Sequence, residues 1–170
     1  MDENTVSYSP RYLAPYDDES ISHYLGRWMR QPTVSISNPL SLSQKIGLGT
    51  TLWRWQRFYF NPPPTDEELE KIGTLMELEV ERLQLMFPPE GETINSEPIR
   101  LCAACYAQIP YHRMQWQFQS TAGCEHHRFR LLSRCRSCGE QFPIPSQWGK
   151  GKCKQCGMLF KSMVKWQKGY

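Results

Sequence analysis

The chain has 170 residues, of which 39% are apolar and 22% are charged, and its net charge is +3. No apolar run approaches the roughly 18–20 residues that a membrane-spanning helix requires. The opening residues, MDENTVSYSP, also lack the positive and apolar regions of a signal peptide. We therefore expect a cytoplasmic protein with no membrane partner. Its seven cysteines should stay reduced, so clustered cysteines are interpreted as metal ligands before disulfides.

The modest net charge hides a division along the chain. Residues 1–97 contain eight lysines and arginines against fifteen acidic residues, which gives −7, whereas residues 98–170 contain twelve against two, which gives +10. A negative surface repels nucleic-acid phosphates and a positive one attracts them. The composition therefore predicts a bipartite protein whose two halves contact different partners.

Residues 1–17 carry tyrosines and prolines without a helical period, which predicts an extended N-terminal arm. A disordered terminus is one interpretation. The other is a docking peptide in which Tyr8, Tyr12 and Tyr16 fill pockets on a partner protein, because closely spaced aromatic side chains in a polar tail favour such contacts.

Helical patterns follow over residues 18–97, the helical half. The first helix is expected over residues 18–30, where apolar side chains recur on one stripe and acidic residues crowd the N-terminus. The stripe consists of Ile21, Tyr24, Leu25, Trp28 and Met29. Two shorter helices are expected at 41–47 and 50–60, separated by glycines.

A capping-box pattern at Thr65 and Glu68 predicts a helix that extends to about residue 78, followed by a short helix at 79–87. Two helices joined this closely resemble a helix-turn-helix. Residues 61–97 carry Lys71 and Arg82 against ten acidic residues, however, so phosphate repulsion opposes DNA reading. We expect this helix pair to pack or to dock a protein, and major-groove reading is the alternative.

An acidic segment rich in proline and glycine leads to residue 97, where the charge changes sign and we expect a domain boundary. Beyond it lies the cysteine-rich half, residues 98–170. It contains four pairs of ligand-type residues, each pair separated by two residues: Cys102 and Cys105, Cys124 and His127, Cys135 and Cys138, Cys153 and Cys156. Seven cysteines and one histidine make two complete four-ligand sets.

This spacing lets both side chains of a tight turn point at one metal ion, and zinc prefers four tetrahedral sulfur or nitrogen ligands. We therefore predict two small zinc-ribbon or zinc-finger units, residues 98–132 with three cysteines and one histidine and residues 133–170 with four cysteines. His126 adjoins His127 and is the alternative fourth ligand of the first unit. Both zinc ions should be structural, because closed shells leave no position for a reacting water.

The cysteine-rich half stays basic after the thiolate charges are counted. Its candidate nucleic-acid ligands are Arg128, Arg130, Arg134, Arg136, Lys150, Lys152 and Lys154, with Trp116, Phe118, Trp148 and Trp166 among them. Basic residues beside aromatic ones suit RNA or single strands, through phosphate attraction and base stacking. The other interpretation is a solvated basic face over a small aromatic core.

The order of these features resembles the TniQ family. Glu19-Ser20-Ile21-Ser22 ahead of Arg27 is similar to the N-terminal signature of that family, and the tract from Cys102 to Cys138 is similar to its finger region. TniQ proteins are target-selection partners of multi-component DNA transposons. In length the chain most resembles the minimal TniQ of type V-K CRISPR-associated transposons.

The resemblance implies a non-catalytic adaptor in RNA-guided transposition. Such an adaptor bridges a CRISPR effector, with its guide RNA and tracrRNA on target DNA near the R-loop, to a filament of the AAA+ ATPase TnsC. The alternative is a stand-alone zinc-finger regulator that binds nucleic acid. An enzyme is the third hypothesis, and the chain has neither a phosphate-cradling glycine-rich loop nor a GxSxG motif.

Overall fold

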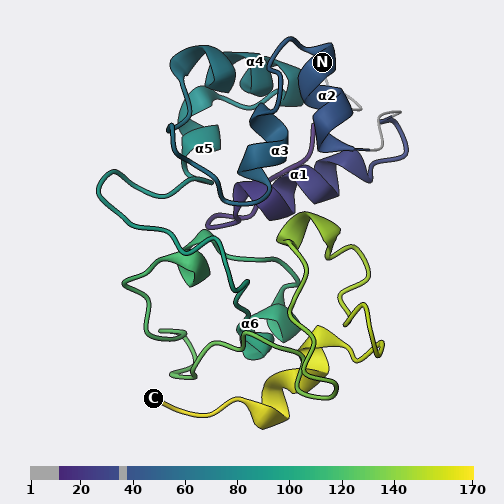
Figure 1. Cartoon of the computed structure of the whole chain (residues 1–170), viewed down its shortest axis with the longest axis vertical. Coiled ribbons are helices and arrows are strands. Elements are labelled where there is room, and N and C mark those ends of the chain that lie inside the picture. Colours follow the sequence, from purple (N-terminus) through teal and green to yellow (C-terminus); the bar gives the residue numbers. More distant parts are fainter. Residues whose placement is uncertain (1–11, 35–37) are drawn as a thin grey trace, which may run out of the picture.

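The computed structural model describes residues 12–34 and 38–170 (Figure 1). The chain is mostly helical, and its β structure within these residues consists of isolated bridges. Helices α1 to α5 gather in one layer, and the cysteine-rich half with α6 forms a second layer beneath them (Figure 1). No helix of the described part has both the length and the apolar character needed to cross a membrane.

The helical half contains the expected helices: α1 Ile21–Met29, α2 Pro39–Lys45, α3 Thr51–Trp55, α4 Asp66–Met76 and α5 Val80–Gln84. Their bounds are tighter than predicted except for α2, which is shifted toward the N-terminus from the predicted 41–47. Caps set several of these ends. The Ser20 hydroxyl accepts from the amide of His23, so α1 begins after Ser20 rather than at residue 18. The Asn38 side chain accepts from the Ser41 amide at 2.8 Å and starts α2.

The predicted capping box of α4 is confirmed. The Glu68 amide donates to the Thr65 hydroxyl at 3.2 Å, and the Thr65 amide donates to the Glu68 carboxylate at 3.3 Å. Helix α4 ends at Glu77, which adopts a left-handed conformation with φ of 57°. Helix α5 contacts α4 but has only five residues, so the helix-turn-helix stays a prediction.

The predicted stripe of α1 faces the core of the helical half, where all of its members but the half-buried Met29 are buried. Residues from every helix of this half complete that core: Leu42, Leu52, Trp55, Leu69, Ile72, Met76, Leu78, Leu83, Met86 and Phe87. Trp55 packs edge-on against Phe87 with 4.8 Å between ring centroids. Burial of these side chains supplies most of the driving force that holds the short helices together.

The cysteine-rich half has one core rather than one core per predicted unit. Its elements are α6 Ala103–Gln108 and three 3-10 helices, η1 Met114–Gln117, η2 Pro145–Gln147 and η3 Phe160–Trp166. The buried Trp148 ring lies 5.7 Å from Tyr106 in the first unit and 5.0 Å from Phe160 in the second. The two predicted units are therefore parts of one packed body.

Helix α1 is buried on two sides, because its second face lies against the cysteine-rich half (Figure 1). That face is small and polar, with Ser22, His23 and Gly26 all buried. A Cβ atom on Gly26 would lie 2.2 Å from the carbonyl oxygen of Ser146 in η2. Only glycine permits this close approach of α1 to η2, which fixes the two halves against each other.

Candidate metal centres

The first set of predicted ligands comes together at the start of α6. Cys102 is the N-cap residue of this helix and Cys105 lies in its first turn, while Cys124 and His127 approach from a separate turn. The Cys105 sulfur lies 3.4 Å from that of Cys124 and 3.3 Å from His127 Nδ1. His127 Nδ1 is 3.8 Å from the Cys102 sulfur. The three cysteines are buried and the histidine is half-buried.

The second set comes from two turns of the chain after residue 132. The sulfur atoms of Cys135 and Cys156 are 3.6 Å apart, and those of Cys138 and Cys153 are also 3.6 Å apart. Each turn contributes one buried and one exposed sulfur, since Cys135 and Cys153 are buried whereas Cys138 and Cys156 are exposed. This second set therefore lies nearer the surface than the first.

The separations of these ligand atoms match a tetrahedral metal site. In each set all four atoms lie within 4.8 Å of one another. Zinc–sulfur bonds of about 2.3 Å in a tetrahedron place neighbouring sulfurs about 3.8 Å apart. A disulfide would instead require about 2.05 Å. Each set can therefore hold one metal ion, and its sulfur-rich composition is consistent with zinc.

The electrostatics of the first set also favour a central cation. The hydrogen bond between the side chains of Cys102 and Cys105 lowers the pKa of Cys102 to about 5 and raises the pKa of Cys105. One thiolate thus suppresses ionisation of its neighbour, because two like charges at this distance repel. A divalent cation at the centre removes that repulsion and favours several thiolates together.

Three of the four ligand pairs use the same backbone turn. The amide of the first ligand donates to the carbonyl five residues later, and the amide four residues later donates back to the first ligand. The forward bonds are Cys124 to Phe129 (2.7 Å), Cys135 to Glu140 (2.7 Å) and Cys153 to Met158 (2.8 Å). The return bonds start from Arg128 (2.8 Å), Gly139 (2.9 Å) and Gly157 (2.9 Å). This repeated turn holds both ligands of a pair on one side.

The residue after the second ligand has a left-handed conformation in each of these turns. Its φ is 76° at Gly139 and 75° at Gly157, where glycine accepts such angles without a steric penalty. The equivalent residue of the first set is Arg128, with φ of 56°. An arginine in this conformation is strained relative to glycine, so Arg128 makes this turn less stable than a glycine would.

The choice between the two adjacent histidines is settled by position. His127 lies with the three cysteines. His126 is exposed, and its Nε2 atom lies 3.4 Å from the Arg113 guanidinium. The structure therefore brings His127, and not His126, into the first set.

Gln167 supports the first set and was not singled out by the sequence. Its carbonyl oxygen accepts from the Ala104 amide at 3.0 Å and lies 3.7 Å from the Cys102 sulfur. Its amide group donates to the Arg130 carbonyl at 3.0 Å. These contacts fix the start of α6 against the end of the chain and so orient Cys102. No spacing signal marks a single glutamine 65 residues away from its partner.

The seven candidate nucleic-acid ligands are all exposed: Arg128, Arg130, Arg134, Arg136, Lys150, Lys152 and Lys154. The three lysines line one cavity together with Arg30 of the helical half, which the sequence did not suggest. Trp116 and Trp148 are buried in the core and cannot stack on bases, whereas Trp166 is 36% exposed. These two rings therefore belong to the small aromatic core that was the alternative interpretation.

The described part of the predicted arm lies against the molecule. Tyr16 stacks on Tyr111 with 4.4 Å between ring centroids, and the Arg27 guanidinium lies 4.5 Å from the centre of the Tyr16 ring. Tyr12 is half-buried and packs against the core of the helical half. Tyr8 falls outside the described residues. Tyr16 thus has an intramolecular contact that a partner would have to share or displace.

The Glu19-Ser20-Ile21-Ser22 segment forms a buried polar network. The carboxylate of Glu19 is fully buried, accepts from Arg27 Nε at 2.7 Å and from Arg27 Nη2 at 2.6 Å, and also contacts His23. Burial raises the pKa of Glu19, but the bonds from Arg27 and His23 outweigh it, so the net shift is downward. Glu19 therefore stays ionised at neutral pH.

The two serines of this segment connect α1 to the cysteine-rich half. Ser20 lies 2.9 Å from His112 Nδ1. The Ser22 hydroxyl donates to the Gln56 carbonyl at 2.7 Å and accepts from the Ser146 amide at 3.2 Å. Beside them the Asp18 carboxylate pairs with Arg113 at 2.7 Å. No sequence pattern predicted this interface between the two halves, because its partners lie 92 and 124 residues apart in the chain.

A comparison with protein-family models found no family that matches the chain, and a search of curated proteins found no matching relative.

Proposed function

We propose that this chain is a non-catalytic adaptor of the TniQ type, which bridges a target-recognition complex to the AAA+ ATPase TnsC in RNA-guided DNA transposition. One observation carries the proposal. The two halves have opposite charge, −7 and +10, and polar contacts at α1 and at the residues just before it join them. A body with two differently charged faces at fixed positions is suited to hold two partners in one orientation.

The helical half supplies the proposed face for the ATPase. Exposed acidic residues cover α4 and α5 and the turn between them: Glu67, Glu70, Glu77, Glu79 and Glu81. Leu85, directly after α5, is 62% exposed, the largest exposure among the large apolar side chains of the described residues. An exposed apolar side chain beside charged residues is typical of a protein contact. The helix-turn-helix-like pair would dock a protein rather than DNA, since its charge repels phosphate.

The cysteine-rich half supplies the proposed face for guide RNA, tracrRNA or target DNA near the R-loop. Its two metal centres, which we assign to zinc, have a structural role. Four ligands in each set complete the zinc shell and leave no open position for a reacting water. They stabilise a half of the chain whose turns are short and whose regular secondary structure is limited.

Co-sedimentation with TnsC, assembled on DNA with ATP, tests the adaptor function. The full-length zinc-loaded chain should enter the pellet with the filament. At a salt concentration at which the chain does not pellet with DNA alone, a variant with Glu81→Gln and Leu85→Ser should stay in the supernatant, because it loses the proposed docking face. A matched variant at Lys165→Gln and Ile109→Ser, two exposed positions of the cysteine-rich half, should sediment as the original chain does.

A second candidate, a stand-alone zinc-finger regulator, is favoured by the seven exposed cations of the cysteine-rich half. It predicts a different result in the same experiment. Failure to sediment with the ATPase, together with tight binding to free RNA or DNA, would replace the adaptor by this regulator.

A further inference from the structure

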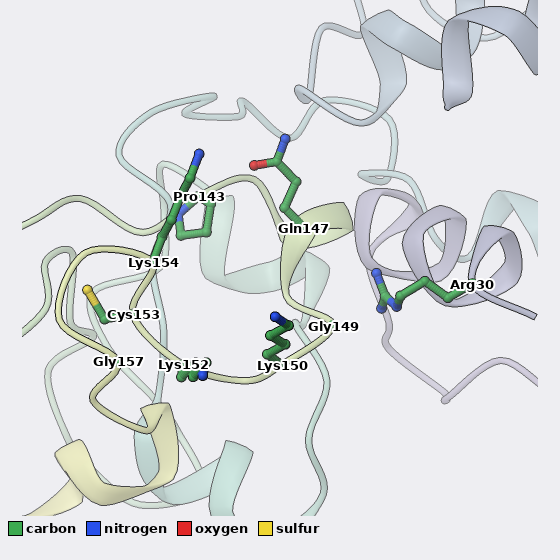
Figure 2. A pocket seen from close by; sticks show the side chains of 9 residues that line it. All are labelled: Arg30, Pro143, Gln147, Gly149, Lys150, Lys152, Cys153, Lys154 and Gly157. Carbon is green, nitrogen blue, oxygen red and sulfur yellow. The ribbon is translucent and has the colours of Figure 1, made fainter. Parts of the chain in front are cut away.

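A cavity lies at the seam between the two halves (Figure 2). Its volume is about 800 Å³. The loop over residues 143–157 provides most of its wall, including Lys150, Lys152 and Lys154, and the end of α1 provides Arg30. In Figure 2 the Arg30 side chain reaches from α1 toward the loop at Gly149, and the lysines come from the loop itself.

A second cavity of about 460 Å³ continues the first, since the two share Arg30, Gly149 and Lys150. It adds Lys161 to the wall, and also Arg27, which is paired with Glu19 at 2.6 Å. We call the two cavities together the seam groove. Among the described residues, no carboxylate lines either cavity, and no ion pair involves Arg30, Lys150, Lys152, Lys154 or Lys161. Five cations thus face one groove without a neutralising partner.

The groove has a fixed shape. Arg30 donates from Nη1 to the Ser146 carbonyl at 2.8 Å, and its side chain lies so close to Gly149 that a Cβ there would be 3.0 Å from it. The loop is held by the Trp148 ring, which donates from Nε1 to the Pro143 carbonyl at 2.8 Å, and by Cys153 of the second metal set. A guanidinium and a loop backbone held in place before binding lose less conformational entropy when a ligand arrives.

We infer that the seam groove binds the sugar–phosphate backbone of a nucleic acid, with Arg30 and Lys150, Lys152, Lys154 and Lys161 on consecutive phosphates. The guanidinium fork and the ammonium groups both match phosphate oxygens. Among the described residues, no aromatic side chain lines the first cavity, and Tyr106 and Trp148, which line the second, are buried. Base stacking therefore contributes little, and the contact does not depend on base identity. Two adjoining cavities suit a strand rather than a single phosphate.

This inference deepens the proposed function and depends on it only for the source of the nucleic acid. The site requires both halves, because Arg30 comes from the helical half and the lysines from the cysteine-rich half. Nucleic acid bound in the groove would therefore contact both halves, including the helical half that we propose binds the ATPase.

Fluorescence anisotropy with the full-length zinc-loaded chain tests the groove, using RNA and DNA duplexes of one sequence over a range of salt. The triple variant Lys150→Gln, Lys152→Gln, Lys154→Gln should lower the slope of log affinity against log salt by about 2 to 3, since each lost phosphate contact removes about 1. The control variant Lys45→Gln, Lys165→Gln, Lys168→Gln removes the same charge outside the groove and should lower the slope by less than about 1.

Gly149→Ala gives a second test in which every charge is kept. The added methyl group pushes on Arg30, so affinity for the duplexes should fall several-fold while zinc content and the circular dichroism spectrum stay unchanged. Preference for the RNA or for the DNA duplex identifies the source, and either supports the groove. Equal losses in the groove and control variants, or displacement of the duplex by polyglutamate at equal charge concentration, would overturn the inference.

The result is separable from the adaptor test. Failure of the groove with normal co-sedimentation removes only the present inference. Failure of co-sedimentation with intact groove binding removes only the ATPase bridge.

Discussion

At the scale of single residues, Arg128 shows a conflict between the turn and the side chain. Its backbone has the left-handed conformation that Gly139 and Gly157 adopt in the equivalent turns, yet its side chain is a large cation. Since glycine would relieve the strain, some other property of arginine must account for its presence. The structure shows one such property, which is the exposed positive charge of Arg128 in the basic half.

We expect Arg128→Gly to raise the free energy of unfolding by about 0.5–1 kcal/mol, because glycine accepts the left-handed conformation without strain. The same variant should bind RNA more weakly than the original chain. The converse change, Gly139→Ala, should lower stability by about 1 kcal/mol or more, although a Cβ there would meet no atom within 4 Å. Urea unfolding in excess zinc measures both. Destabilisation by Arg128→Gly would show that the arginine supports the turn.

His112 gives a residue-level prediction about pH. It is fully buried, and burial lowers its pKa well below the ordinary value of 6.5. Its Nδ1 atom lies 2.9 Å from the Ser20 hydroxyl and its Nε2 atom 3.3 Å from the Gln117 carbonyl oxygen, which suits a neutral ring with one donor and one acceptor. The unfolded chain binds a proton at this histidine near pH 6.5, whereas the folded chain does not.

The His112 contribution to stability is therefore fully present above pH 6.5 and declines as the pH falls below it, by up to about 1.4 kcal/mol per pH unit. His112→Gln removes this titration, so its stability should fall less between pH 7 and pH 5.5 than that of the original chain. Proton competition for the metal ligands acts on both proteins, and excess zinc keeps it equal. Parallel pH profiles would show that His112 does not titrate in this range in either state.

At the scale of elements, α1 is the piece on which the architecture depends. Replacing glycine by alanine inside a helix normally stabilises it by about 1 kcal/mol. Gly26→Ala should instead destabilise the protein by about 1–3 kcal/mol, because the added Cβ would overlap the Ser146 carbonyl of η2. The sign of the change, measured by thermal or urea unfolding, distinguishes the two effects. A more stable variant would mean that α1 and η2 do not pack as described.

How much of this could be predicted from the sequence differs between elements. Periodic apolar residues predicted α1, and the Thr65–Glu68 pattern predicted the start of α4, because both signals are local. The paired spacing of cysteines likewise predicted the two metal sets. The second face of α1 could not be predicted, since it depends on contacts such as that between Arg30 and Ser146, which lie 116 residues apart. A local sequence pattern does not indicate which distant element will pack against a polar helix face.

The boundary near residue 97 illustrates the same limit. The charge changes sign there, but the polar contacts between Asp18 and Arg113 and between Ser20 and His112 run across it. The net charge of a segment is set mainly by its many exposed side chains. The packing between the two halves depends on a few residues at their interface, and these contribute little to the net charge.

At the scale of the whole molecule, the two metal sets should differ in lability. Cys138 and Cys156 of the second set are exposed, while the cysteines of the first set are buried. We expect a chelator to remove one equivalent of zinc quickly and the other slowly, measured with a colorimetric zinc indicator. Cys156→Ser should abolish the fast phase and leave the slow one. Loss of the slow phase in that variant would reverse the assignment.

The double-sided burial of α1 bears finally on how such a protein can change over evolutionary time. The Asp18–Arg113, Ser20–His112 and Gly26–Ser146 contacts each join a position of the helical half to one of the cysteine-rich half. Recombination that exchanged one half between diverged relatives would combine mismatched partners at all three contacts. The halves should therefore be inherited as one unit, and substitutions at these paired positions should co-vary among homologues.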